Sequence, residues 1–288
     1  MSLPAAFEAW GPLTEEVGKS GVLRLTLAPR RGRTVIADQY WRIPLQGLPP
    51  SYQDGDDEAY VYLLNPTGGI VQGDRLQPAI TLAPGARAVI STQSATKVYR
   101  MDETYAEEVN HYILHGDAVL ECLPDQTIPF AGSRFYRSTR IDLDPNATLI
   151  LTDLLAAGRV ARGEQFGFEQ FFVEVEVSVG REPCLVDRLH FEPADGRMDR
   201  LGLWNDYVYY GSLYAYSPRL DKDLIMTLAE LIESCDGVYG GAGGPAPSFT
   251  VVRVLGRTTW AVREILFNAW DLLRRRLVGK PARPLRKL

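Results

Sequence analysis

Alternation of apolar and polar residues dominates roughly the first 215 residues of the chain. Leu23, Leu25 and Leu27 are separated by polar residues, and the run Val173–Val179 places a valine at every second position. A period of two over such lengths is typical of β-strands with one buried face. Long helical periodicity is absent from this part, so we expect a mainly β body over residues 21–215.

A weak internal repeat is superimposed on this alternation. Each copy is a strand, a turn built on Gly, Pro, Asn or Asp, and an alanine that opens a second strand. The copies are Ile80–Ile90, Tyr112–Cys122 and Ile141–Leu151, with their alanines at Ala86, Ala118 and Ala147. The segment Val175–Phe191 resembles a degenerate fourth copy. Repeats of this length predict stacked β-layers, either a β-solenoid or a β-sandwich.

Helical spacing of apolar residues replaces the alternation near the C-terminal end. It predicts two C-terminal α-helices, over residues 221–234 and 258–277. Thr258 or Thr259 can cap the start of the second helix, and Gly279 can end it. Between the helices, the segment Gly237–Phe249 is rich in glycine but lacks the Lys-Ser or Lys-Thr of a phosphate-binding loop. We interpret it as a flexible turn, and we expect no nucleotide site.

The composition is that of an ordinary globular protein, with 45% hydrophobic and 23% charged residues over 288 positions. No sharp break in composition occurs, so we expect a single domain over residues 1–288. The net charge of −5 argues against a nucleic-acid-binding protein. No stretch reaches the roughly 18 to 20 apolar residues of a membrane helix, and the N-terminal residues lack the pattern of a signal peptide. We therefore expect a cytoplasmic location.

Three segments concern the surface, and two of them leave alternatives open. After Asp271 every charged residue is basic, which fits either a solvated helix end or a tail that docks on an acidic surface. The acidic insertion Pro49–Tyr60 is expected to be a surface loop. The tyrosine-rich run Asp206–Tyr216 is either an exposed patch for a partner or a β-edge packed under a helix.

Histidine and cysteine give little support for a tight metal site. The chain has three of each, and the cysteines are too scattered for a disulfide framework. His111 and His115 flank a strand-like run, where four residues span about 13 Å. We do not expect them to chelate a metal as a pair.

Five motifs stand out in order along the chain. They are LLNPTGGIVQGDRL (Leu63–Leu76), STQSATKVYR (Ser91–Arg100), LPDQTIPF (Leu123–Phe130), DLLAAGRVARGE (Asp153–Glu164) and LVDRLHF (Leu185–Phe191). Each is weak alone, but the order and spacing together resemble the urease accessory protein UreD family, also called UreH. The resemblance extends from about Gly21 to Lys280.

This resemblance implies a right-handed β-helix-like body of stacked strands with two C-terminal helices. It implies a non-enzymatic role in urease maturation. The family's partners are UreF, which recruits the GTPase UreG, and the urease apoprotein on which the assembly docks. Nickel is then the transported ion, carried through an internal polar tunnel, and the protein has no cofactor of its own.

Four residues fall where the family places polar groups that line the tunnel: Asp74, Thr96, Asp153 and Asp187. Carboxylates bind nickel more weakly than imidazole or thiolate, and a conduit must release its ion. We therefore expect the three aspartates to make transient metal contacts. The alternative for each is that the carboxylate holds a turn by binding backbone amides. Asp187 stands where the family pattern has glutamate, so its contact is expected to need a bridging water.

A rival reading is a β-solenoid carbohydrate hydrolase that uses a pair drawn from Asp74, Asp153 and Asp187. Such chemistry needs two carboxyl groups about 5 to 10 Å apart in an open cleft. The absence of a secretion signal weighs against it, since polymeric sugars are mostly extracellular. Burial of these acids in separate places would exclude this version.

Overall fold

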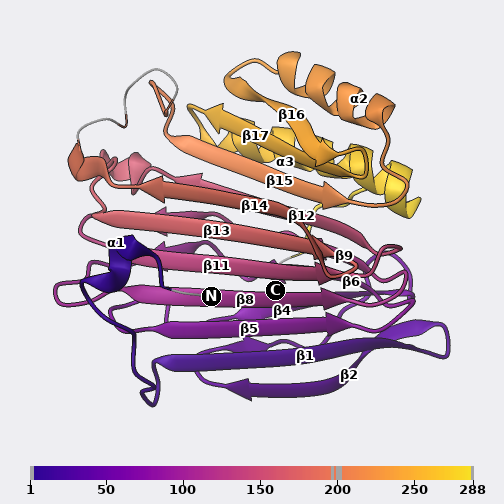
Figure 1. The fold of residues 1–288 in the computed structure, drawn as a ribbon, viewed down its shortest axis with the longest axis horizontal. Coiled ribbons are helices and arrows are strands. Elements are labelled where there is room, and N and C mark those ends of the chain that lie inside the picture. The colour runs from indigo at the N-terminus through magenta and orange to yellow at the C-terminus, as the bar shows by residue number, and fades with distance from the viewer. Residues whose placement is uncertain (1–2, 196–197, 199–202, 287–288) are drawn as a thin grey trace.

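Two β-sheets face each other in a computed structural model that describes residues 3–195, 198 and 203–286. Within these residues the first sheet has seven strands, in spatial order β14 (Glu182–Phe191), β13 (Gln170–Val179), β11 (Arg134–Leu143), β8 (Ala106–Leu114), β5 (Arg75–Leu82), β1 (Ser20–Arg30) and β2 (Arg33–Arg42). The second follows the order β16 (Val238–Ala246), β17 (Phe249–Gly256), β15 (Tyr209–Tyr216), β12 (Thr148–Ala156), β9 (Val119–Cys122), β6 (Arg87–Thr92), β4 (Glu58–Leu64) and β3 (Gln46–Gly47), with β7 (Thr96–Val98) and β10 (Thr127–Pro129) beside it. The main apolar core lies between the sheets (Figure 1).

The repeat seen in the sequence is the coil of a β-solenoid. The chain passes from β5 to β6, from β8 to β9 and from β11 to β12, so each copy crosses from the first sheet to the second. Corresponding strands of successive copies pair in parallel. The alanines stack, because the N–H of Val119 donates to the carbonyl of Ala86 and that of Thr148 to Ala118, both at 2.9 Å. The expected mainly β, β-helix-like fold is confirmed.

The predicted fourth copy, Val175–Phe191, is wrong. β14 runs antiparallel to β13 in the same sheet instead of crossing to the second one. Gly180 and Arg181 both have positive φ, 58° and 73°, and they form the tight turn between the two strands. Two left-handed residues in a row favour a hairpin whose twist matches its strands. The solenoid therefore ends at this hairpin.

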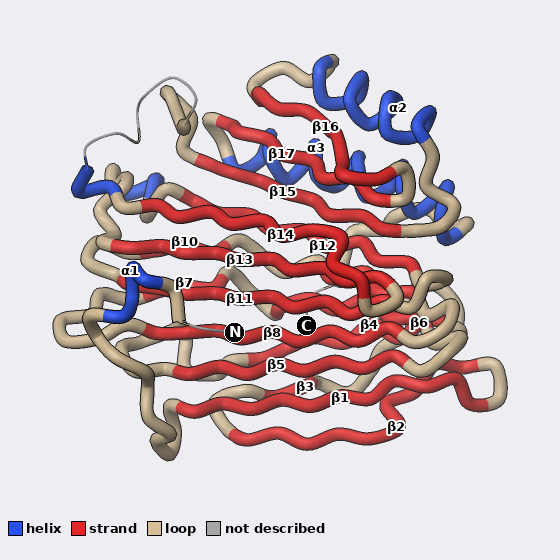
Figure 2. The backbone as a smooth tube through the Cα atoms, viewed as in Figure 1, coloured by secondary structure: helices blue, strands red, loops and turns tan. Residues whose placement is uncertain are grey.

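The predicted C-terminal helices are present as α2 (Lys222–Glu233) and α3 (Thr259–Leu273), and α3 continues into one π-helical turn, η3 (Arg274–Val278). Both pack their apolar faces against the outer face of the second sheet (Figure 2). The hydroxyl of Thr258 accepts a hydrogen bond from the N–H of Ala261, which makes it the cap of α3. Gly279, at a φ of 81°, ends the helical segment.

The segment Gly237–Phe249, expected to be a flexible turn, is mostly strand β16, paired antiparallel with β17. Its glycines allow a close approach. A Cβ at Gly240 would overlap the carbonyl oxygen of Arg253, and one at Gly244 would overlap that of Phe249. Glycine thus permits a tight edge pairing here instead of providing flexibility.

The tyrosine-rich run is not an exposed patch. β15 lies between β12 and β17. Its tyrosines at 210, 214 and 216 pack into the core between the sheets, while Gly211 faces α3. A Cβ at Gly211 would come within 2.6 Å of Val262. The strand packs under a helix, as one alternative expected, but it is an interior strand and not an edge of the sheet.

The basic tail and the acidic insertion bind each other. Arg274 is completely buried and pairs with Glu58 at 2.6 Å and with Glu121. Lys280 pairs with Asp57 at 2.8 Å, and Arg283 also pairs with an acid of the insertion. The tail therefore docks on an acidic surface of its own chain, and the insertion is not a free surface loop. Lys287, the last basic residue of the tail, lies outside the described residues.

Three short helices complete the described elements: α1 (Ala5–Glu8), η1 (Val160–Arg162) and η2 (Pro193–Asp195). Phe7 of α1 is buried against Tyr105 and Tyr136 on the outer side of the first sheet. Among the helices described, none has the length and apolar character needed to cross a membrane.

Candidate functional site: a polar cavity between the sheets

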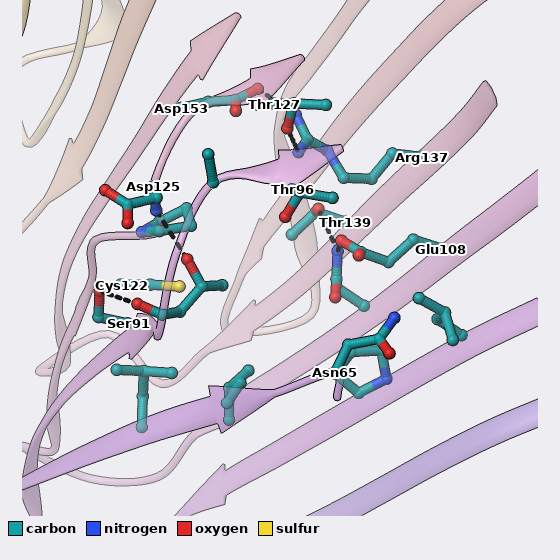
Figure 3. A pocket seen from close by; sticks show the side chains of 18 of the residues that line it. Asn65, Ser91, Thr96, Glu108, Cys122, Asp125, Thr127, Arg137, Thr139 and Asp153 are labelled. Carbon is teal, nitrogen blue, oxygen red and sulfur yellow. Dashed lines mark hydrogen bonds and ion pairs between the residues drawn. The ribbon is translucent and has the colours of Figure 1, made fainter. Parts of the chain in front are cut away.

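A cavity of about 140 Å³ lies between the two sheets of the solenoid. Segments far apart in the sequence line it, and four of the five motifs contribute residues. These residues are Asn65 and Gly69 from the first motif, Thr92–Thr96 from the second, Pro124, Asp125 and Thr127 from the third, and Asp153 from the fourth. Gly68 and Ser94, both exposed, lie at its rim. Residues from the segments that carry the most distinctive sequence features therefore line one cavity (Figure 3).

Polar side chains replace apolar ones along two neighbouring rows of the first sheet. On β8, Glu108 and Asn110 point between the sheets, since they share the parity of the core residues Ala106, Tyr112 and Leu114. Arg137 and Thr139 occupy the matching places on β11: the register pairs Glu108 with Arg137 and Asn110 with Thr139. The amide of Asn110 donates to Glu108 at 3.0 Å and to Thr139 at 3.2 Å.

Asp153 reaches the same space from the second sheet. On β12 it alternates with the core residues Leu149, Leu151 and Leu155, so its side chain points inward. The guanidinium of Arg137 donates to Asp153 Oδ2 and, at 3.2 Å, to the hydroxyl of Thr127. Figure 3 shows Asp153 and Thr127 converging on Arg137. The other oxygen, Asp153 Oδ1, is buried and has no hydrogen-bond partner among the residues that the structure describes.

The charges around the cavity favour a cation. Burial lowers the pKa of Arg137, but the carboxyl groups of Asp153 and Glu108 outweigh this and hold the pKa above its ordinary value, so the guanidinium stays charged. Three acidic side chains, Glu108, Asp125 and Asp153, thus line the cavity with one basic one, although Asp125 is also paired with Arg263. Cys122 also lines the cavity, but burial raises the pKa of its thiol to about 12. At neutral pH it is a thiol and not the thiolate that binds metals strongly.

Two of the four residues expected from the sequence, Thr96 and Asp153, line the cavity. Asp187 does not line the cavity but contacts a residue that does. The hydroxyl of Tyr214, which lines the cavity, donates to Asp187 Oδ2 at 2.8 Å. The other carboxylate oxygen of Asp187 pairs with Arg253 at 2.6 Å. Asp187 is therefore linked to the cavity through a tyrosine instead of opening onto it.

Asp74 is not among the residues that line the cavity. It is buried, and its Oδ2 accepts a hydrogen bond from the N–H of Val71 at 2.9 Å, which closes the turn before β5. Burial raises the pKa of Asp74 to about 6, despite this hydrogen bond and the nearby charge of Lys19. The contacts of Asp74 match the alternative in which its carboxylate holds a turn by binding a backbone amide. A contact between Asp74 and nickel stays a prediction.

The sequence reasoning missed Glu108, Asn110, Arg137 and Thr139. The signal was present, because period-two alternation extended through β8 and β11 puts all four on the buried side. His111 and His115 pair with Asp142 and Asp144. Within the described ranges no group of three or more His, Cys, Asp or Glu side chains is arranged to hold a metal ion.

A family model described as UreD urease accessory protein matches residues 19–287. The chain belongs to the UreD family. The protein named urease accessory protein UreD in Actinomyces naeslundii is 33% identical over 269 residues, which are 93% of this chain and 98% of that protein. The one in Haloarcula marismortui is 32% identical, over 94% of this chain and 91% of its own length. In Bacillus cereus the identity is 28%, over 93% and 98%.

Membership of the UreD family assigns the chain to urease maturation, among proteins named as accessory proteins and not as enzymes. The geometry agrees with this. Asp153 is paired with Arg137, Asp187 with Arg253, and Asp74 is buried in a turn away from the cavity. The pair of free carboxyl groups in one open cleft that a glycoside hydrolase needs is absent from these three acids.

Proposed function

We propose that this protein is the scaffold for nickel insertion into urease in the cytoplasm. In this proposal it binds UreF, which recruits the GTPase UreG, and the assembly docks on the urease apoprotein. Nickel is its cargo, and the cavity between the sheets is part of the route. The protein needs no cofactor of its own.

The observation that carries the proposal is a polar cavity within the mainly apolar core between the two sheets. Thr96, Glu108, Asn110, Thr139 and Asp153 offer hydroxyl, amide and carboxyl oxygens to the cavity. Nickel binds such ligands less tightly than thiolate or imidazole, which suits an ion that must enter and leave. Burying these polar groups costs free energy unless they form hydrogen bonds with each other or bind a ligand.

The test is complementation with the partners from the same operon. A urease operon that lacks this gene is expressed with and without it, and the urease activity and the nickel content of the purified urease are measured. We expect nickel-loaded, active urease only when the chain is present. A tagged chain should also elute with UreF and UreG in one peak on size exclusion. The proposal would be overturned if urease stayed inactive with the chain present, or if the chain eluted separately from both UreF and UreG.

A further inference from the structure

The cavity already contains a cation of its own, the guanidinium of Arg137. We infer that Arg137 is a resident counter-ion that a transported divalent cation must displace from Asp153, so that it limits how tightly the cavity holds the ion. This inference rests on the proposed nickel route and adds a residue to it that sets the affinity. The argument depends on where the two acids lie relative to the guanidinium.

Only one of the two carboxylate oxygens of Asp153 is engaged by Arg137. Its Oδ2 accepts from Arg137, while Oδ1 is buried without a partner among the described residues. An incoming cation can therefore meet Oδ1 first and compete for the whole carboxylate afterwards. A carboxylate that Arg137 already neutralises attracts the ion less than a bare one would. The ion pair thus weakens nickel binding without closing the site.

Arg137 has a second acid to turn to. Glu108 lies beside Arg137 on the adjacent parallel strand, and neighbouring strands are about 4.8 Å apart. The charge of Glu108 already raises the pKa of Arg137. The hydrogen bond from Arg137 to Thr127 is made through a different nitrogen from the one that binds Asp153. When nickel takes Asp153, the guanidinium keeps Thr127 and is compensated by Glu108. When nickel leaves, the pair with Asp153 re-forms and favours release.

The first test measures nickel binding to the full-length chain by equilibrium dialysis against nickel chloride. We expect Arg137→Gln to lower the Kd for nickel at least tenfold, because the competing cation is gone. Asp153→Asn should weaken binding, and the double variant should show no gain over Asp153→Asn. The control is Arg140→Gln on the same strand, whose side chain is exposed and pairs with Asp142 outside the cavity. It should bind nickel as the unmodified chain does.

The second test follows release. In the complementation assay Arg137→Gln should lower urease activity at least threefold while the chain itself co-purifies with more nickel. Unchanged nickel affinity in Arg137→Gln overturns the inference. If that variant does not fold, Arg137→Met is measured instead, because methionine removes the charge while keeping much of the apolar side-chain volume. It should bind nickel at least threefold more tightly, and equal binding overturns the inference. Failure of the unmodified chain to activate urease would instead overturn the proposed function.

Discussion

At the scale of single residues, Arg274 makes the most consequential contact outside the cavity. It is the one basic residue of the tail that is fully buried in the described structure, and it faces two fully buried acids, Glu58 and Glu121. Trp270 also donates to Glu121. Removing one partner of a buried ion pair leaves an uncompensated charge, which is more costly than never burying the pair.

We expect Arg274→Met to lower the free energy of unfolding by roughly 3 to 5 kcal/mol, because it leaves Glu58 and Glu121 buried together without a cation. Urea denaturation followed by circular dichroism measures this. The control, Arg275→Met, removes an exposed arginine that pairs with Asp271 on the helix surface, and it should cost less than about 0.5 kcal/mol. Equal effects of the two substitutions would contradict the assignment of Arg274 as the anchor of the tail.

Asp74 makes stability depend on pH. Because burial raises its pKa from 3.8 to about 6, the folded chain holds this proton more tightly than the unfolded chain does. Its contribution is therefore fully present below about pH 3.8 and is lost as pH rises through about 6. A shift of this size corresponds to roughly 3 kcal/mol. Asp74→Asn cannot titrate, so it should gain stability relative to the unmodified chain between pH 4 and pH 7.

Urea denaturation at pH 4, 5.5 and 7 checks this expectation. The control is Asp206→Asn, since hydrogen bonding from Arg257 lowers the pKa of Asp206 and confines its titration to lower pH. The stability of that variant relative to the unmodified chain should stay constant above pH 5. A constant difference for Asp74→Asn over the same range would show that the carboxyl group is not titrating as described.

At the scale of elements, sequence patterns predicted the repeated strands and the helices but missed the hairpin that ends the solenoid and the strand β16. The alternating strands and the alanine-marked coils follow from local periodicity, and so do α2 and α3. The hairpin of β13 and β14 ends the solenoid through two residues, Gly180 and Arg181, whose positive φ values apolar patterning does not encode. β16 was missed because Val238 is its one β-branched residue and glycine, alanine and proline make up most of the strand, which depends instead on its pairing with β17.

The glycines of β16 test that explanation in matched pairs. A Cβ at Gly240 or Gly244 would overlap backbone oxygens of β17, whereas one at Gly241 or Gly243 meets nothing within 4 Å. We expect Gly240→Ala and Gly244→Ala to cost about 1 to 3 kcal/mol and to expose the amides of β16 to hydrogen exchange. Gly241→Ala and Gly243→Ala should stay within about 0.5 kcal/mol. Equal effects at all four positions would mean that close approach is not what glycine provides.

At the scale of the whole molecule, the cavity exists only because separate coils meet. Thr96, Thr127 and Asp153 come from different parts of the chain, and their convergence depends on the parallel stacking of coils. From the sequence, Thr96 and Asp153 could be expected there through the family resemblance, and alternation puts Arg137 on the buried side, but the pairing of Arg137 with Asp153 could not be expected. This pairing depends on a distance across the two sheets, which no local pattern contains.

The same architecture allows the conduit to be tested separately from the scaffold. Asn110→Leu keeps the side-chain volume roughly constant but removes the amide that links Glu108 to Thr139 inside the cavity. We expect the complex with UreF and UreG to form as before, since the substitution is internal, while urease activity and the nickel content of urease fall several-fold. His111→Leu is the matched control, because the next residue of β8 points to the outer side and pairs there with Asp142. Full activation by Asn110→Leu would place the nickel route elsewhere, and loss of the complex would show that the cavity supports the scaffold itself.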